Sequence, residues 1–95
     1  MPKPRKSLFN DPYIRIIHAL IERRKALSLT QVELGALYGE DQSFVSRIER
    51  CQRRLDVYEF TRWCRLLEVD PGEVLRPIWE AEPEPARKTD TGNEG

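Results

Sequence analysis

The 95-residue sequence has little of what catalytic and metal-binding proteins use. It contains one histidine, two widely spaced cysteines and five scattered glycines. It therefore lacks a metal-ligand spacing, a Gly-rich phosphate loop and a nucleophile next to a general base. We interpret Cys51 and Cys64 as free thiols in a reducing compartment and assign no function to His18. We expect no enzyme activity and no cofactor.

Long hydrophobic runs are also missing. A membrane-spanning helix needs about 20 consecutive apolar residues, and no stretch of the chain approaches that length. Leu8 and Phe9 follow a basic start, but Asn10, Asp11 and Pro12 come directly after them, so there is no apolar region of a signal peptide. We therefore predict a cytoplasmic protein with no membrane partner.

The chain has no net charge, but its charges are unevenly distributed. Residues 1–78 hold 14 Lys and Arg against 11 Asp and Glu, whereas residues 79–95 hold 2 against 5. We predict a flexible basic N-terminal arm at 1–9, one domain at 10–79 and a disordered acidic tail at 80–95. The arm is either a solvated tail or a segment that contacts phosphates or a DNA groove.

What the sequence does contain is a series of helix start signals. Asp11 before Pro12 is typical of an N-cap followed by proline at the first helical position. N-cap and capping-box residues recur along the chain: Thr30 with Glu33, Asp41, Asp56 with Glu59, and Asp70 with Pro71 and Glu73. Gly39 and Pro77 mark helix ends, because glycine accepts positive φ and proline interrupts the helical hydrogen bonds. The predicted helices span about 11–27, 30–37, 41–49, 56–67 and 71–76.

Apolar residues at helical spacing predict one buried face on each helix. The predicted core residues are Tyr13, Ile17, Leu20, Ile21, Leu27, Leu34, Leu37, Phe44, Val45, Ile48, Phe60, Trp63, Cys64 and Leu67. Trp63 has a second interpretation as a stacking platform for a base, but core packing is more common at this spacing. The sequence therefore predicts an all-α fold class.

The stretch 41–49 divides cleanly by angle. At about 100° per residue, Phe44, Val45 and Ile48 fall on one side of the helix. Its other side carries an amide, two hydroxyls and a guanidinium, from Gln42, Ser43, Ser46 and Arg47. These groups hydrogen-bond to base edges in a major groove, where glutamine suits adenine and arginine suits guanine. The pattern of 30–49 therefore indicates a helix-turn-helix.

These residues resemble the phage repressor/Cro family, also called the xenobiotic-response-element (XRE) family of bacterial regulators. The family pattern is represented by Leu29-Thr30-Gln31-x-Glu33-Leu34, by Gly39 and by Ser43-x-Val45-Ser46-Arg47-Ile48-Glu49-Arg50. The resemblance continues through Arg53-Arg54-Leu55-Asp56 to Leu67-Glu68-Val69-Asp70-Pro71. It implies a compact five-helix lambda-repressor-like DNA-binding domain.

The predicted DNA contacts fall into two groups. Gln42, Ser43, Ser46 and Arg47 face the bases. Gln31 would help to hold a phosphate at the start of the helix 30–37, where backbone N–H groups are free. The resemblance implies that Arg53 and Arg54 lie near the DNA backbone, and the alternative is that they are solvated arginines that support the fold.

The resemblance also assigns structural roles. It implies an ion pair between Arg24 and Glu49, whereas Arg23 and Lys25 belong to a charged, outward face. Cys51 occupies a position at which the family usually has glycine. A positive φ at Cys51 would cost about 1–2 kcal/mol, or else the turn differs from that of the family.

The resulting hypothesis is a small prokaryotic or phage transcriptional regulator, a repressor, that binds double-stranded DNA as a homodimer. The late apolar residues Val74, Leu75, Ile78 and Trp79 would partly close the core and partly form the dimer contact. Two alternatives stay open. One is an antitoxin or restriction-system controller that binds a protein partner through its C-terminal tail, and the other is a helical interaction module without DNA binding.

Overall fold

The computed structural model describes residues 11–85, and in this range it contains five α-helices and no strand. The helices are α1 (Pro12–Ala26), α2 (Gln31–Tyr38), α3 (Gln42–Glu49), α4 (Val57–Leu66) and α5 (Pro71–Ala81). The all-α, five-helix fold class predicted from the sequence is confirmed. The predicted basic arm, 1–9, and residues 86–95 of the predicted tail lie outside the described residues.

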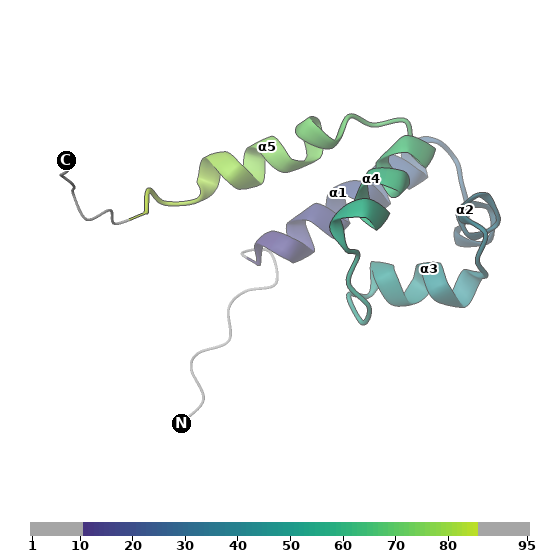
Figure 1. Ribbon diagram of the computed structural model, residues 1–95. Helices are drawn as coiled ribbons and strands as arrows, with labels where there is room; N and C mark the ends of the chain where they lie inside the picture. The colour runs from purple at the N-terminus through teal and green to yellow at the C-terminus, as the bar shows by residue number, and fades with distance from the viewer. Residues whose placement is uncertain (1–10, 86–95) are drawn as a thin grey trace, which may run out of the picture.

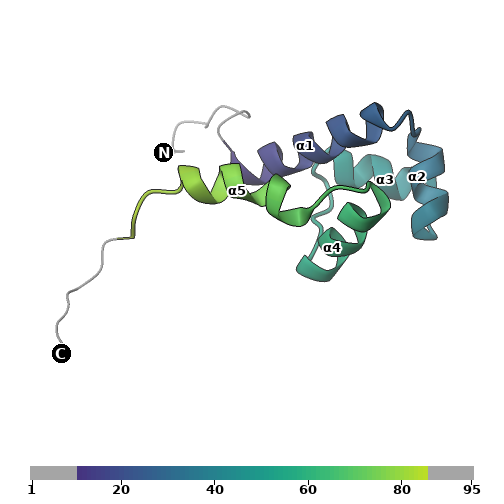
Figure 2. The ribbon, with the colours of Figure 1, turned by 90° about the horizontal axis from the view of Figure 1, so that it is seen from above.

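The helices pack around α1 and α4. α3 lies on one side of these two helices and α5 on the other, while α2 closes one end (Figure 1). α2 packs against α3 and α4, and α5 packs against α1. The second half of α5 extends past the start of α1 in both views (Figure 2). This half of α5 is therefore covered by few other residues of the described chain.

The first four helices begin at the predicted capping residues. The Asp11 carboxylate accepts from Tyr13 N at 2.9 Å, and the Asp41 carboxylate accepts from Phe44 N at 3.0 Å. Complete capping boxes join Thr30 to Glu33 and Asp56 to Glu59. Each box pairs two backbone N–H groups that would otherwise lack a partner, so the start of α2 and the start of α4 are fixed locally.

The capping prediction for α5 is wrong in its details. Asp70 occupies the N-cap position, but its side chain makes no cap hydrogen bond. Its carboxylate lies beside Gly72 instead, where an added Cβ would be 2.8 Å from Oδ2. The backbone carbonyl of Asp70 accepts from Glu73 N at 2.9 Å. Because Pro71 has no N–H, one of the N–H groups that a helix start must satisfy is absent here.

The predicted end of α5 before Pro77 is also wrong. The helix continues through Pro77 to Ala81, so Glu80 and Ala81 belong to α5 rather than to the tail. Val74 is buried and Ile78 is half-buried, so apolar side chains are covered on both sides of the proline. The stabilisation from this packing offsets the backbone hydrogen bond that Pro77 cannot donate.

Three helices end at a non-glycine residue in the left-handed conformation. These residues are Ser28 (φ 60°) after α1, Cys51 (φ 61°) after α3 and Glu68 (φ 57°) after α4. Each is followed by a backbone N–H that donates back into the helix, as Gln52 N does to Arg47 O at 2.8 Å. This is the hydrogen bonding of a Schellman motif. The positive φ considered for Cys51 is therefore present, whereas those of Ser28 and Glu68 have no signal in the sequence.

The core lies between α1, α2, α3, α4 and the first turn of α5. Its buried apolar residues are Ile17, Leu20, Leu34, Phe44, Val45, Ile48, Trp63, Cys64, Leu67 and Val74. The prediction for Leu37 is wrong, since its side chain is 54% exposed. Tyr38 packs against the core instead of Leu37, because it lies only about 40° from the buried Leu34 around the helix. The Tyr38 ring stacks on the Phe44 ring, with 5.6 Å between the ring centres, and its centre lies 5.0 Å from that of the Trp63 ring.

Candidate nucleic-acid interface

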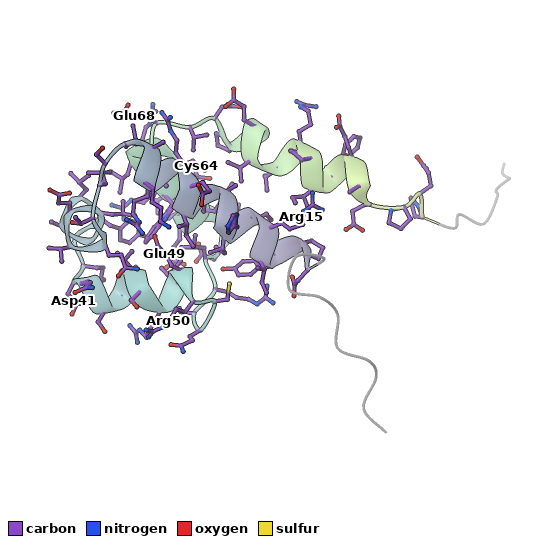
Figure 3. The ribbon with its side chains drawn as sticks, turned by 180° about the vertical axis from the view of Figure 1, so that it is seen from behind. Arg15, Asp41, Glu49, Arg50, Cys64 and Glu68 are labelled. Carbon is purple, nitrogen blue, oxygen red and sulfur yellow. The ribbon has the colours of Figure 1, made fainter. Side chains whose placement is uncertain are left out.

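α3 has an inner apolar face and an outer polar face. Its buried side chains are Phe44, Val45 and Ile48. On the outer face, Gln42, Ser43 and Arg47 are exposed and Ser46 is half-buried. Glu49 lies on the inner side of the helix and Arg50 on the outer side (Figure 3). The four residues predicted to read bases therefore lie on the surface of a helix that is anchored from behind.

The turn between α2 and α3 depends on two glycines. Gly39 has φ 93°, which confirms the predicted left-handed end of α2. Gly35 has a different role, because an added Cβ would be 2.9 Å from the carbonyl oxygens of both Glu40 and Asp41. The absence of a side chain at Gly35 lets the turn pass close to α2. Sequence reasoning missed Gly35, which has no positive φ and lies in the middle of a helix.

A hydrogen-bonded network connects α1, α2 and α3 behind the outer face. Arg24 Nε donates to Glu49 Oε2 at 2.7 Å, and Arg24 Nη2 donates to Glu49 Oε1 at 3.0 Å. The structure thus contains the ion pair that the family resemblance implied. Gln31 Nε2 also donates to Glu49 Oε1, at 2.8 Å, and Gln42 Nε2 donates to Gln31 Oε1 at 3.2 Å. The outermost member, Gln42, is therefore linked through two side chains to α1.

The two arginines predicted to lie near the DNA backbone have different surroundings. Arg53 donates to both carboxylate oxygens of Glu59, at 3.1 and 2.9 Å, and its guanidinium lies 4.8 Å from the centre of the Phe44 ring. The hydrogen bonds from Arg53 lower the pKa of the Glu59 carboxyl group, and the same pairing raises the pKa of Arg53. Arg54 is exposed, with its guanidinium 4.2 Å from the centre of the Tyr13 ring. Its charge is more available to a phosphate than that of Arg53.

Arg23 does not lie on a merely solvated face, as the sequence suggested. Its Nε donates to Leu67 O at 2.8 Å, and its Nη2 donates to Glu68 O at 2.9 Å. A guanidinium at the carbonyl end of a helix satisfies free acceptors and opposes the negative end of the helix dipole. Arg23 therefore joins α1 to the end of α4.

Arg50 was not singled out from the sequence, although it lies on the outer side of α3 (Figure 3). Its guanidinium donates to Gln52 Oε1 at 3.2 Å and is exposed. The angular count that selected the base-reading residues would have found it. Three helical steps beyond Arg47 place Arg50 about 60° away, on the arc between Ser43 and Ser46. Arg50 is thus an additional cation on this surface.

Metal-ligand groups and membrane-spanning helices were sought in the part of the chain that the structure describes. Residues 11–85 bring no three His, Cys, Asp or Glu side chains together in a group that would hold a metal ion. None of the helices in this range combines the length and the hydrophobicity that crossing a bilayer requires.

Known proteins resemble this chain in sequence and in fold. The profile of the helix-turn-helix family matches residues 20–74, more than half of the chain. The structure of an XRE-family like protein from Pseudomonas syringae pv. tomato str. DC3000 is similar, with 41% sequence identity and a TM-score of 0.71. The chain belongs to the XRE-type helix-turn-helix family. The similarity covers 80% of this chain and 93% of the Pseudomonas protein. A search of curated proteins gives no match.

The XRE-type family is a family of DNA-binding transcription regulators, so the broad function of this chain follows from its membership. The matched residues include all of α2, α3 and α4 and both members of the Arg24–Glu49 ion pair. The match ends at Val74, whereas α5 continues to Ala81. The residues of α5 that follow Val74 therefore lie outside the segment that the family profile matches.

Proposed function

We propose that the chain is a sequence-specific repressor that binds double-stranded DNA as a homodimer, with α3 in the major groove. The observation that carries this proposal is the outer face of α3, which presents polar side chains while three buried apolar residues hold the helix from behind. A helix with its side chains is about 10–12 Å wide and fits a major groove about 12 Å wide. Repression requires only that the bound protein cover a promoter.

Base reading is assigned to four residues of α3. After donating to Gln31, Gln42 keeps its Oε1 and one Nε2 hydrogen, and this pair matches N6 and N7 of adenine. Arg47 is exposed and matches O6 and N7 of guanine. Ser43 and Ser46 carry hydroxyl groups that either donate or accept, so they suit more than one base.

Phosphate contacts are assigned to three residues that flank α3. Gln31 is the first residue of α2, where free backbone N–H groups and the helix dipole favour an anion. Arg54 presents an exposed guanidinium. Arg53 contributes less charge than Arg54, because Glu59 already neutralises it. These contacts would fix the position of the protein on DNA without reading the sequence.

The proposed dimer contact is an exposed apolar surface on α5. Trp79 is 75% exposed and Leu75 is 39% exposed. These residues line the same shallow depression, with Gly72 and Arg76. Aromatic residues are enriched in the buried centres of protein interfaces, and an exposed tryptophan beside an apolar depression suits such a contact. A two-fold dimer would place two α3 helices on half-sites about 10 bp apart.

The DNA-reading proposal is tested by comparing two arginine variants on selected and random DNA. Arg47→Ala should weaken binding to the selected site by about 1–3 kcal/mol and relax the preference at one base pair. The matched control, Arg54→Ala, should weaken binding to all sequences by a similar factor and lower the salt dependence. If Arg47→Ala weakened binding to selected and random DNA by the same factor, the assignment of α3 as the helix that reads bases would be contradicted.

The dimer is tested by sedimentation of the full chain. Trp79→Ser should convert dimers to monomers and weaken operator binding, whereas Val32→Ser, at another exposed apolar position, should leave the dimer intact. A wild-type chain that is monomeric alone would contradict the homodimer. The exposed Trp79 would then favour the alternative of a controller or antitoxin that binds a protein partner with this end of the chain.

A further inference from the structure

We propose that Tyr13 is a positioning residue for the phosphate contact of Arg54, because its ring holds the Arg54 guanidinium in place without neutralising it. This inference rests on the proposed function, which assigns Arg54 to the DNA backbone. Two contacts carry it. The guanidinium carbon of Arg54 lies over the Tyr13 ring, 4.2 Å from its centre, and the Tyr13 hydroxyl accepts from Leu55 N at 3.0 Å. The sequence predicts Tyr13 only as a core residue.

Tyr13 is itself fixed at the start of α1. Its backbone N–H donates to the Asp11 carboxylate at 2.9 Å. Its side chain is half-buried and packs against the hydrophobic core. A tyrosine side chain has only two torsion angles, so a ring that is packed on one side retains little freedom. The ring of Tyr13 is therefore a rigid support for the groups that contact its exposed parts.

The hydroxyl group of Tyr13 fixes the backbone next to Arg54. Leu55, whose N–H it accepts, directly follows Arg54 and lies 42 positions from Tyr13 in the sequence. The carbonyl oxygen of Arg54 accepts from Arg53 Nη1 at 3.2 Å. Both peptide groups that follow the Cα atoms of Arg54 and of its neighbour are thus tied to side chains. The Arg54 side chain accordingly leaves the loop from a fixed point.

Arg53 and Arg54 are adjacent but are held by different kinds of group. Arg53 donates to both carboxylate oxygens of Glu59, whereas no carboxylate oxygen of residues 11–85 lies within 4 Å of an Arg54 nitrogen. A carboxylate neutralises a guanidinium, but an aromatic ring attracts the cation through its quadrupole and carries no net charge. Arg54 therefore keeps its full charge for a phosphate, which a guanidinium binds with two parallel hydrogen bonds.

The ring should raise DNA affinity by ordering Arg54 before DNA arrives. A long side chain without support samples many rotamers, and its ordering on binding lowers affinity. The Tyr13 ring restricts these rotamers and leaves the opposite side of the guanidinium open to a phosphate. From the strength of exposed cation–π contacts, we expect this support to raise affinity about two- to fivefold. The effect should be the same for every DNA sequence, because phosphate contacts carry no sequence information.

The test measures the affinity of the full chain for the selected site and for random DNA. Tyr13→Leu, which stays apolar but loses the ring, should weaken both about two- to fivefold. Tyr13→Phe keeps the ring and should stay within about twofold of the wild type, although its contact with Leu55 N is lost. Tyr58→Leu is the matched control, since Tyr58 is an exposed tyrosine of α4, and it should leave both affinities unchanged.

A double variant separates positioning from general loss of structure. In an Arg54→Ala background, Tyr13→Leu should cause no further loss of DNA affinity, because the ring then has no guanidinium to hold. A Tyr13→Leu change that merely loosened the fold would weaken binding in both backgrounds by the same factor. Urea unfolding of each variant shows whether the chain is folded under the conditions of the binding measurement.

Proton NMR of the wild-type chain gives a test that needs no change at Tyr13. Protons above the face of an aromatic ring resonate upfield of their usual positions, so the side-chain resonances of Arg54 should be shifted in this direction. The shift should persist when a duplex with the selected site is added, since ring and phosphate bind opposite sides of the guanidinium. Loss of the shift on DNA would show that the ring competes with the phosphate and would overturn the inference.

Two further sets of results would contradict the inference and are distinguishable. If Arg54→Ala weakens binding to all DNA while Tyr13→Leu leaves affinity unchanged or raises it, Arg54 contacts phosphate without help from Tyr13. The inference then fails and the proposed function stands. A wild-type chain that binds no DNA would overturn both together, and that failure is visible before any variant is made.

Discussion

Arg24 and Glu49 lie 25 positions apart in the sequence and are joined by hydrogen bonds of 2.7 and 3.0 Å behind the outer face of α3. Both side chains are almost fully covered. Glu49 ends α3 and Arg24 lies near the end of α1, so the pair ties the helix that faces DNA to the longest helix of the domain. A packed pair of this kind holds α3 at one angle relative to the rest of the fold.

Loss of one partner should therefore destabilise the domain strongly. Arg24→Met leaves Glu49 charged and covered, with Gln31 as its remaining side-chain partner, and removal of one member of a buried ion pair costs about 3–5 kcal/mol. Urea unfolding followed by circular dichroism measures the change. Arg65→Met, at an exposed position of α4, is the control and should change the free energy of unfolding by less than about 0.5 kcal/mol. A similar small change for Arg24→Met would show that the pair contributes little.

Gly35 and Gly72 should respond in opposite ways to the same substitution. Gly35→Ala places a Cβ 2.9 Å from two backbone oxygens, so we expect a loss of about 1–3 kcal/mol as the turn before α3 shifts. At Gly72 the close atom belongs to the Asp70 side chain, which is free to rotate. Gly72→Ala should raise stability by up to about 1 kcal/mol, because alanine favours helix. Chemical denaturation of both variants tests the contrast, and equal effects would contradict it.

The left-handed residue after α4 offers a stabilising substitution. Glu68 is exposed and has φ 57°, a conformation that costs a non-glycine residue about 1–2 kcal/mol. Glu68→Gly should remove that strain, and the greater freedom of glycine in the unfolded chain should reduce the gain to about 0.5–1 kcal/mol. Glu22→Gly, inside α1, is the matched control and should lower stability by about 1 kcal/mol. A lower melting temperature for Glu68→Gly would show that its side chain contributes more than its backbone strain costs.

Acid should weaken the contact that Arg53, in the loop after α3, makes with Glu59 of α4. The Arg53 side chain, followed by the backbone N–H of Asp56, lowers the pKa of Glu59 below its ordinary value of 4.5. A carboxyl group with a lower pKa in the folded protein contributes stability above its unfolded pKa, and this contribution is lost as pH falls through the folded pKa. Wild-type protein should therefore lose stability below about pH 4.5 more steeply than Glu59→Gln. Parallel pH profiles for the two proteins would contradict the prediction.

The buried thiol should be unreactive in the folded protein. Burial, with a smaller effect of Asp70, raises the pKa of Cys64 to about 11. At about pH 8 only roughly one such thiol in a thousand is the reactive thiolate. Cys64 should thus be labelled by a thiol reagent only when the chain unfolds, and its labelling rate should follow denaturant concentration. In native buffer, fast labelling of the Cys51→Ser variant would show that Cys64 is accessible.

The sequence by itself determined where the first four helices begin and which residues form the two faces of α3. The boxes at Thr30–Glu33 and Asp56–Glu59 connect residues three positions apart, and the apolar side of α3 follows from the helical repeat. These features depend on neighbours within one turn, so they are readable along the chain. The Arg24–Glu49 pair was predicted only through a family resemblance, since its partners belong to different helices.

Only the tertiary structure decided which charged side chains bind other parts of the fold and which are available to a partner. Arg23 binds the end of α4, 44 and 45 positions away, and Arg53 is paired with Glu59, although each resembled a free cation in the sequence. α5 continues through Pro77, where a proline alone predicts a helix end, and Val74 and Ile78 pack on either side of it. In each case the outcome depends on contacts between distant segments, whose energies exceed the local preferences of one residue. The hydrogen bonds that join Arg24, Glu49, Gln31 and Gln42 have the same origin, because α1, α2 and α3 must meet before these side chains come together.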